Sequence, residues 1–146
     1  MTGALKQQLD RTRTFRSRSA LNEITGVVID SAMTIHSDLG HGLLESSYER
    51  ILERALHRRG LFVQRQLRCD FEYDAMLFRN GIRIDLLVEH SVVVELKAEA
   101  ASQRAHARQV LSYLRLLHLP VGLLINFGAP HLRDGIHRLI NGSLDA

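Results

Sequence analysis

Two apolar segments separated by a helical one limit the possible folds of this chain more than any other feature. Residues 92–96 (VVVEL) and 121–127 (VGLLINF) have the composition of buried strands, and the second segment lies between Pro120 and Gly128. Between them, residues 102–117 repeat apolar side chains three or four positions apart, as one face of a helix does. A strand, a helix and a strand in this order predict two parallel neighbours in one sheet.

Two helices are predicted near the start of the chain. Apolar residues recur with helical spacing over residues 21–39 and again over residues 44–56. Gly40 and Gly42 separate the two stripes, and Gly60 is well placed as the C-terminal cap of the second helix. The two helices should therefore meet at a glycine corner.

Three consecutive antiparallel strands are predicted between these helices and the strand-helix-strand unit. Residues 61–73 have a composition typical of strands, and Asn80-Gly81 between apolar runs predicts a hairpin turn. Residues 82–88 alternate, and a tight turn at residues 89–91 leads them into the strand at 92–96. A final helix or turn is predicted around Ile136, Leu139 and Ile140. The predicted class is α/β, with a mixed sheet flanked by helices in the order ααβββαβ.

Length and charge divide the chain into one domain and a short basic head. A chain of 146 residues has the size of a single domain. Residues 1–20 carry five basic side chains and one acidic one, so we expect a basic, flexible segment there and a nearly neutral domain over residues 21–146. Cys69 is the single cysteine, and no apolar run approaches the roughly 18 residues of a membrane span. These features predict a reduced, cytoplasmic protein without a membrane partner.

Charged residues inside the predicted strands mark the candidate site. Asp85 lies within IRIDLLV, and Glu95 and Lys97 lie within VVVELKA. A hairpin that turns near residue 90 places Asp85 opposite Glu95, and Glu95 and Lys97 are two positions apart, so they share a face. Buried carboxylates are normally paired or bound to a cation, because isolated burial of a charge costs several kcal/mol.

This charged trio has two interpretations. The first is a structural ion network in which Lys97 pairs with Asp85 and Glu95. The second is a metal site, since carboxylate oxygens are the ligands that Mg²⁺ prefers and a compact ammonium suits the activation of water. The chain has 17 arginines and only two lysines, so a lysine in this strand favours the second interpretation.

The site residues belong to a longer set that resembles a known family. Gly42, Glu45 and Tyr48 in GLLESSY match the motif that names the GxxExxY proteins, a group within the PD-(D/E)XK nuclease-like superfamily. The resemblance covers about residues 32–141, although Ile84 stands where the family usually has Pro. Its other matching positions are His36, Gly40, Asp85, Glu95, Lys97, His106, Gln109, Tyr113 and the segment GLLINFGAP.

The resemblance implies a restriction-endonuclease-like core, a divalent metal (Mg²⁺, with Mn²⁺ as an alternative) and phosphodiester hydrolysis. It implies that Asp85, Glu95 and Glu45 are metal ligands and that Lys97 positions or activates the attacking water. Gln109, one turn before Tyr113, resembles a Gln-x-x-x-Tyr element of superfamily exonucleases. The catalytic residues expected from it are Lys97, Glu95, Asp85 and Gln109, and the supporting residues are Tyr48, Tyr113, His36 and His106.

The principal hypothesis is therefore a metal-dependent nuclease that acts on DNA or RNA. Two alternatives stay open: a noncatalytic domain that binds nucleic acid or protein, and a hydrolase of another phosphate compound. The near-neutral domain lacks a long basic stripe, so the basic head, a homodimer or a protein partner would complete a nucleic-acid groove. The candidate phosphate contacts in the head are Arg11, Arg13, Arg16 and Arg18.

Overall fold

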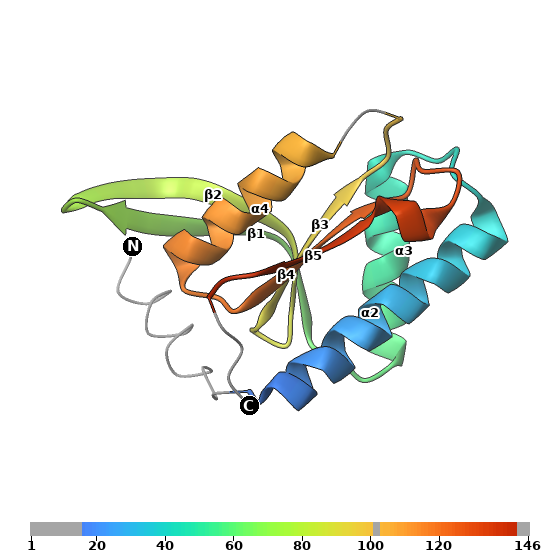
Figure 1. Ribbon diagram of the computed structural model, residues 1–146, viewed down its shortest axis with the longest axis horizontal. Coiled ribbons are helices and arrows are strands. Elements are labelled where there is room, and N and C mark those ends of the chain that lie inside the picture. Colours follow the sequence, from blue (N-terminus) through green and yellow to red (C-terminus); the bar gives the residue numbers. More distant parts are fainter. Residues whose placement is uncertain (1–15, 101–102, 143–146) are drawn as a thin grey trace.

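The computed structural model describes residues 16–100 and 103–142 (Figure 1). Its helices are α2 (Arg18–Leu39), α3 (Glu45–Arg58), α4 (Arg104–Leu117) and a short 3-10 helix, η1 (Leu132–Gly135). Its strands are β1 (Val63–Tyr73), β2 (Met76–Val88), β3 (Val92–Lys97), β4 (Val121–Asn126) and β5 (Ile136–Ile140). The predicted order ααβββαβ is present, followed by one further strand.

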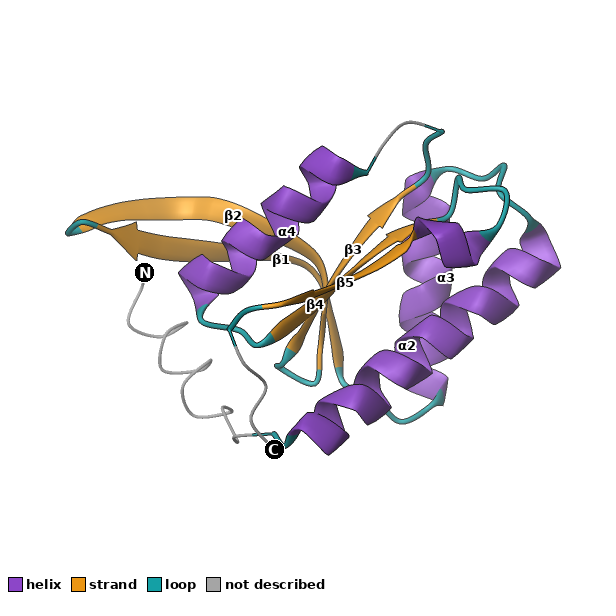
Figure 2. Ribbon diagram, in the orientation of Figure 1, coloured by secondary structure: helices purple, strands orange, loops and turns teal. Residues whose placement is uncertain are grey.

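The strands form one mixed sheet in the order β1-β2-β3-β4-β5. β3 and β4 are parallel, and the other neighbouring pairs are antiparallel. Helix α4 covers one face of the sheet, and α2 and α3 cover the other (Figure 2). The predicted α/β class, with a crossover through α4 and helices on both faces, is confirmed.

Local sequence accounts for the ends of the first two helices. Ser17 caps α2 by accepting a hydrogen bond at its hydroxyl from the Ala20 amide (3.1 Å). Gly40 ends α2 with a φ of 75°, and Gly60 follows α3 with a φ of 82°, a left-handed backbone that glycine adopts without strain. The predicted helices and their glycine boundaries are therefore confirmed. Among the described helices, none combines the length and the apolar character needed to cross a membrane.

The sheet buries its core on both faces. Every residue of β4 is buried, because α4 packs over one face and α2 over the other. Cys69 is buried in the cluster beneath α4, where burial raises the pKa of its thiol to about 11. The thiol is therefore protonated at neutral pH, which agrees with a packing role and not with a nucleophile.

The turn between β1 and β2 corrects the Asn80-Gly81 prediction. The strands reverse at Asp74 and Ala75, whose positive φ values of 49° and 59° form a two-residue turn. Asn80 instead lies within β2, opposite a shift in the pairing register, and its amide donates to Asp70 Oδ1 (2.7 Å). Gly81 is required there for a different reason: a Cβ at this position would collide with the Phe71 ring. The glycine therefore serves a bulge and not a turn.

The last element is a strand, so the prediction of a helix or turn around Ile136, Leu139 and Ile140 was wrong. β5 pairs antiparallel with β4, from Ile125 opposite Ile136 to Val121 opposite Ile140. Five residues are too few for a stable helix, whereas a strand satisfies the free backbone groups along the edge of β4. The periodicity of so short a segment does not distinguish these outcomes.

Candidate active site

The candidate site lies where β2 and β3 separate. Their ladder pairs Val88 with Val92, Leu87 with Val93 and Leu86 with Val94, which confirms the predicted register. At the next position along the two strands, side chains replace backbone groups in the hydrogen bonds between β2 and β3.

At that position the Asp85 amide donates to Glu95 Oε1 (3.0 Å), and the Leu96 amide donates to Asp85 Oδ2 (2.9 Å). The two carboxylates thus occupy places that backbone carbonyls hold in a continuous sheet.

Burial and mutual repulsion set the electrostatics of this pair. Asp85 is 4% exposed and Glu95 is 5% exposed. Burial, and then the neighbouring Asp85 carboxylate, raises the pKa of Glu95 to about 9, while the Asp85 amide and Lys97 act in the opposite direction. Glu95 is therefore protonated near neutral pH in the protein alone. A cation beside the two carboxylates would remove this repulsion.

Lys97 lies at the end of β3, two residues after Glu95, and is partly buried. Its positive charge lowers the pKa of both Glu45 and Glu95, so it is near the carboxylates. Within the described part of the chain, however, no ion pair involves Lys97. The salt-bridged network considered from sequence is therefore not formed, and the ammonium is available to another negative group.

Helix α3 adds two acidic residues to the same region. Glu45 is the first residue of α3, and its pKa is raised by burial and by the charges of Asp85, Glu49 and Glu99, against the effect of Lys97. Glu49, one turn later, is buried. Glu45 and Glu49 are therefore the acidic residues of α3 that lie near Asp85 and Glu95.

Gln66 links Glu49 to Asp85. Its Nε2 donates to both carboxylate oxygens of Glu49 (2.9 Å each) and to Asp85 Oδ1 (3.3 Å). Gln66 has a φ of 52°, a strained backbone for a residue inside a strand. Sequence analysis missed both residues. Glu49 is four positions after Glu45 and so shares its helix face, a signal that could have found it; nothing comparable marks Gln66.

The expected supporting residues near the helix corner hold loops. Tyr48 is fully buried; its hydroxyl donates to the Gly40 carbonyl (2.7 Å) and accepts from the Leu43 amide (3.1 Å), and its ring stacks on Phe127. His36 Nε2 lies 2.8 Å from the Ala129 carbonyl oxygen. Tyr48 therefore fixes the loop before the N-terminus of α3, and with it the position of Glu45, whereas His36 joins α2 to the loop after β4.

The expected residues on α4 differ in their relation to the site. Tyr113 is partly buried, and its pKa is raised by burial and by the charges of Glu95 and Asp85. Gln109 is one turn earlier on the same helix face, is exposed and forms no hydrogen bond with the described residues. His106 Nε2 lies 2.6 Å from Glu99 Oε1, beyond the end of β3.

The structure does not bring the described arginines of the basic head to this site. Arg11 and Arg13 lie outside the described residues. Arg16 donates through Nε to Ser91 Oγ (2.9 Å) at the turn before β3, whereas Lys97 is at the far end of that strand. Arg18 is exposed at the start of α2.

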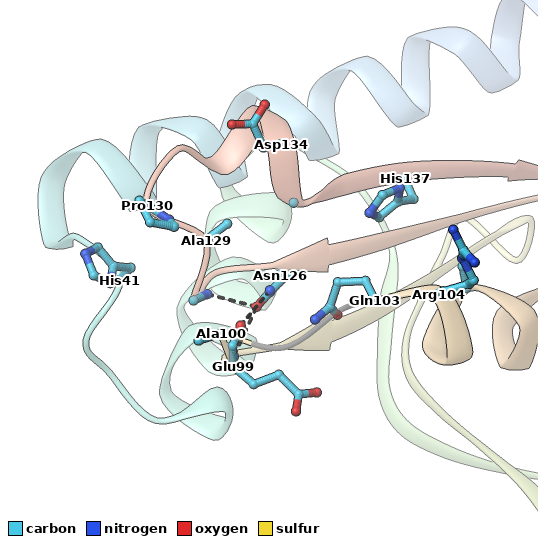
Figure 3. Close-up of a pocket in the computed structure, with 13 residues that line it drawn as sticks. His41, Glu99, Ala100, Gln103, Arg104, Asn126, Ala129, Pro130, Asp134 and His137 are labelled. Carbon is cyan, nitrogen blue, oxygen red and sulfur yellow. Dashed lines mark hydrogen bonds between the residues drawn. The ribbon is translucent and has the colours of Figure 1, made fainter.

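A cavity of about 760 Å³ adjoins the site at the ends of β3 and β4 (Figure 3). Asn126 forms one wall: its Oδ1 accepts from the amides of Glu99 (3.1 Å) and Gly128 (3.0 Å), and its Nδ2 donates to the Glu99 carbonyl (2.7 Å). Glu99 also acts on the pKa of Glu45, so the cavity and the carboxylates are neighbours. Asn126 therefore joins the segment that follows β3 to the segment that follows β4.

Gly128→Ala is expected to destabilise the fold by about 3 kcal/mol or more. A Cβ at this position would lie 2.5 Å from the Glu99 amide nitrogen and 2.8 Å from the Ala98 carbonyl carbon, so backbone would have to move. Gly26→Ala in α2 is the matched control, because nothing lies within 4 Å of its Cβ position. It should stabilise the protein by about 0.5–1 kcal/mol. Urea unfolding checks both changes, and equal effects would contradict the prediction.

The comparisons with known proteins assign the family. A family model described as the PD-(D/E)XK nuclease superfamily matches residues 22–139. The match spans most of the chain, and the chain belongs to this superfamily, with its nuclease-like α/β fold. No curated protein and no solved structure gives a significant match. Members of this superfamily generally use divalent metal ions.

Proposed function

We propose that this protein is a metal-dependent nuclease that hydrolyses phosphodiester bonds of DNA or RNA. The observation that carries the proposal is the pair of buried carboxylates, Asp85 and Glu95, at the point where β2 and β3 separate. Lys97 lies near them and forms no ion pair with another described residue. A structural role alone does not require a Glu95 carboxylate on the Asp85 amide, an Asp85 carboxylate on the Leu96 amide and a nearby lysine that forms no ion pair with the described residues. The finer assignment to the GxxExxY group is part of this proposal and is supported by Gly42, Glu45 and Tyr48.

The donor set fits a hard divalent cation. Across residues 16–100 and 103–142, no group of three or more His, Cys, Asp or Glu side chains is gathered as a complete metal cage. Mg²⁺ is usually held by one or two carboxylates, with water and substrate oxygens in its other positions. Asp85 and Glu95 would be the ligands, with Glu45 nearby; Mg²⁺ is the expected ion and Mn²⁺ the alternative. When bound, the cation neutralises the charge of the phosphate and lowers the pKa of water.

The other catalytic roles would belong to side chains of the protein itself. Asp85 is held by the Leu96 amide and by Gln66, so its orientation is fixed before substrate binds. Lys97 brings a positive charge and three N–H donors to the same end of β3, where it would orient water or stabilise the charge that develops on the phosphate. Tyr113, on α4, is close enough to Glu95 and Asp85 for their charges to raise its pKa, so it would lie beside the bound cation.

Titration calorimetry with Mg²⁺ and Mn²⁺, together with cleavage of single- and double-stranded DNA and RNA, tests the proposal. Wild-type protein should bind the ion and cleave at least one substrate, and the Asp85→Asn, Glu95→Gln double variant should do neither. The Glu23→Gln, Asp38→Asn variant is the control, because it removes two exposed acids from α2. Ion binding that is equal in the three proteins, or cleavage by the double variant, would refute the proposal.

A further inference from the structure

The outer part of β1 and β2 forms a free two-stranded ribbon, which we define as residues 67–84. β3 pairs with β2 only between Leu86 and Val88, so the ribbon has no third strand in the described structure. Figure 1 shows the hairpin extending well past the rest of the sheet. β2 runs nine steps from Met76 to Asp85, which at about 3.3 Å per residue gives the ribbon a reach of roughly 30 Å from the site.

Two arginines face each other across this ribbon. Arg68 of β1 is the register partner of Arg83 of β2, and both side chains are exposed. Their neighbours along the strands, Leu67, Cys69, Ile82 and Ile84, pack in the cluster beneath α4. Because side chains alternate along a strand, Arg68 and Arg83 point to the face of the ribbon opposite α4, where both are exposed.

This arginine pair is the next step along the ribbon from the candidate active site. Arg65 pairs with Leu86 and Leu67 pairs with Ile84, so Gln66 and Asp85 lie opposite each other between them. Arg83 is two residues before Asp85, a distance of about 7 Å along the strand. Its charge also lowers the pKa of Tyr113, on which Glu95 and Asp85 act as well. The arginines therefore flank the carboxylates.

Among the described residues, this pair has no direct hydrogen-bond or ion-pair partner. Like charges directly opposite each other on neighbouring strands are destabilising. Neither Arg68 nor Arg83 forms a hydrogen bond or an ion pair with any residue in the ranges that the structure describes. Both guanidinium groups can therefore bind phosphate oxygens, which arginine contacts with two parallel hydrogen bonds.

We propose that Arg68 and Arg83 bind the sugar-phosphate backbone next to the scissile bond and that the ribbon lies along the nucleic acid. This inference rests on the proposed nuclease function. It identifies the ribbon as the surface that would bind nucleic acid beside the candidate active site. A two-stranded ribbon fits a major groove, and at roughly 3.4 Å per base pair its reach corresponds to about nine base pairs. The exposed apolar residues at its end would meet bases or sugars; they are Tyr73, Met76, Leu77 and Phe78.

Fluorescence anisotropy in the presence of a chelator, which prevents metal-dependent cleavage, tests the inference. The probes are labelled DNA and RNA of about 20 nucleotides, each as a duplex and as a single strand, which distinguish the two sources of the same phosphate chemistry. Arg68→Ala with Arg83→Ala should weaken binding of the preferred probe about tenfold at 0.15 M salt. It should also reduce the slope of log K against log salt by about two, since two phosphate contacts are lost.

Two variants control for charge and for folding. Arg54→Ala with Arg58→Ala removes the same charge from exposed positions of α3 and should leave the slope unchanged. Arg68→Lys with Arg83→Lys keeps the charge and should retain most of the slope. Because the wild-type pair is repulsive, the alanine variant should unfold at the same temperature as wild type or a higher one.

The outcomes separate the inference from the proposed function. Cleavage by wild type together with unchanged binding by the alanine variant would refute the role of the ribbon and leave the nuclease function intact. Binding that depends on the ribbon, without cleavage under any metal condition, would support the inference and refute catalysis. Equal losses in the α3 control, or no binding of any probe by wild type, would also overturn the inference.

Discussion

Lys97→Met is expected to reduce the rate of phosphodiester cleavage about a thousandfold while the protein stays folded. The side chain is partly buried at the end of β3, and within the described residues it forms no ion pair that its removal would break. Methionine keeps most of the length and apolar contact of the lysine stem but removes the charge. The loss should therefore appear in kcat under saturating metal and substrate, with little change in thermal unfolding.

Lys97→Arg is the informative companion to this variant. Arginine restores a positive charge but replaces the compact ammonium with a planar guanidinium, so we expect only partial recovery of cleavage. If Lys97 instead belonged to a structural ion network, Lys97→Met would leave uncompensated buried acids and lower the unfolding temperature sharply. Unfolding of this kind, or full activity of Lys97→Met, would exclude the assigned role.

Most of the sheet could be predicted because its signals are local. The apolar run that forms β4, the helical spacing of α4 and the tight turn before β3 each lie within a few residues, and their order determines the parallel pair. The register of β2 against β3 could be predicted from the position of the turn between them, because paired residues lie equally far from the turn on either side. That register alone predicts that Asp85 and Glu95 lie together.

The incorrect predictions about the fold concern residues that can serve in more than one kind of local structure. Asn80-Gly81 resembles a hairpin turn, but the left-handed conformation of Asn80 and the missing Cβ of Gly81 serve equally well in a bulge. Asp74 and Ala75, which make the actual turn, lack the usual asparagine or glycine and are held in it by the pairing of two long strands. The pairing of β1 with β2 over their whole length determines which of the two positions forms the turn. This pairing leaves no signal in the local sequence.

The missed site residues depend on contacts between segments distant in sequence. Gln66 reaches Glu49, 17 positions away, and Asp85, 19 positions away, through a single side-chain amide. Its role arises from a distorted backbone at the point where β1 and β2 change the faces to which their side chains point. Such a distortion depends on packing against helices on both faces of the sheet, with Ile84 in the cluster beneath α4 and Leu86 in the cluster beneath α2 and α3, which composition and periodicity do not reveal.

Stability in the absence of divalent metal is expected to fall as pH rises from about 5 to about 9. The folded protein raises the pKa of the Glu95 carboxyl from 4.5 to about 9, because the group is buried beside Asp85. Between these values the unfolded chain has lost the proton that the folded protein retains, so the folded state binds more protons. Stability must then decrease as pH rises across this range.

The difference between wild type and Glu95→Gln isolates this effect, because glutamine resembles the protonated acid and does not titrate. With a chelator present, urea unfolding should show similar stability for the two proteins near pH 5 and a growing advantage for Glu95→Gln toward pH 9. Mg²⁺ should reduce that advantage, since the ion stabilises the ionised pair only in wild type. Parallel pH profiles would mean that burial and the Asp85 charge do not raise the pKa of Glu95 in the folded protein, which would remove the electrostatic reason for a cation at this site.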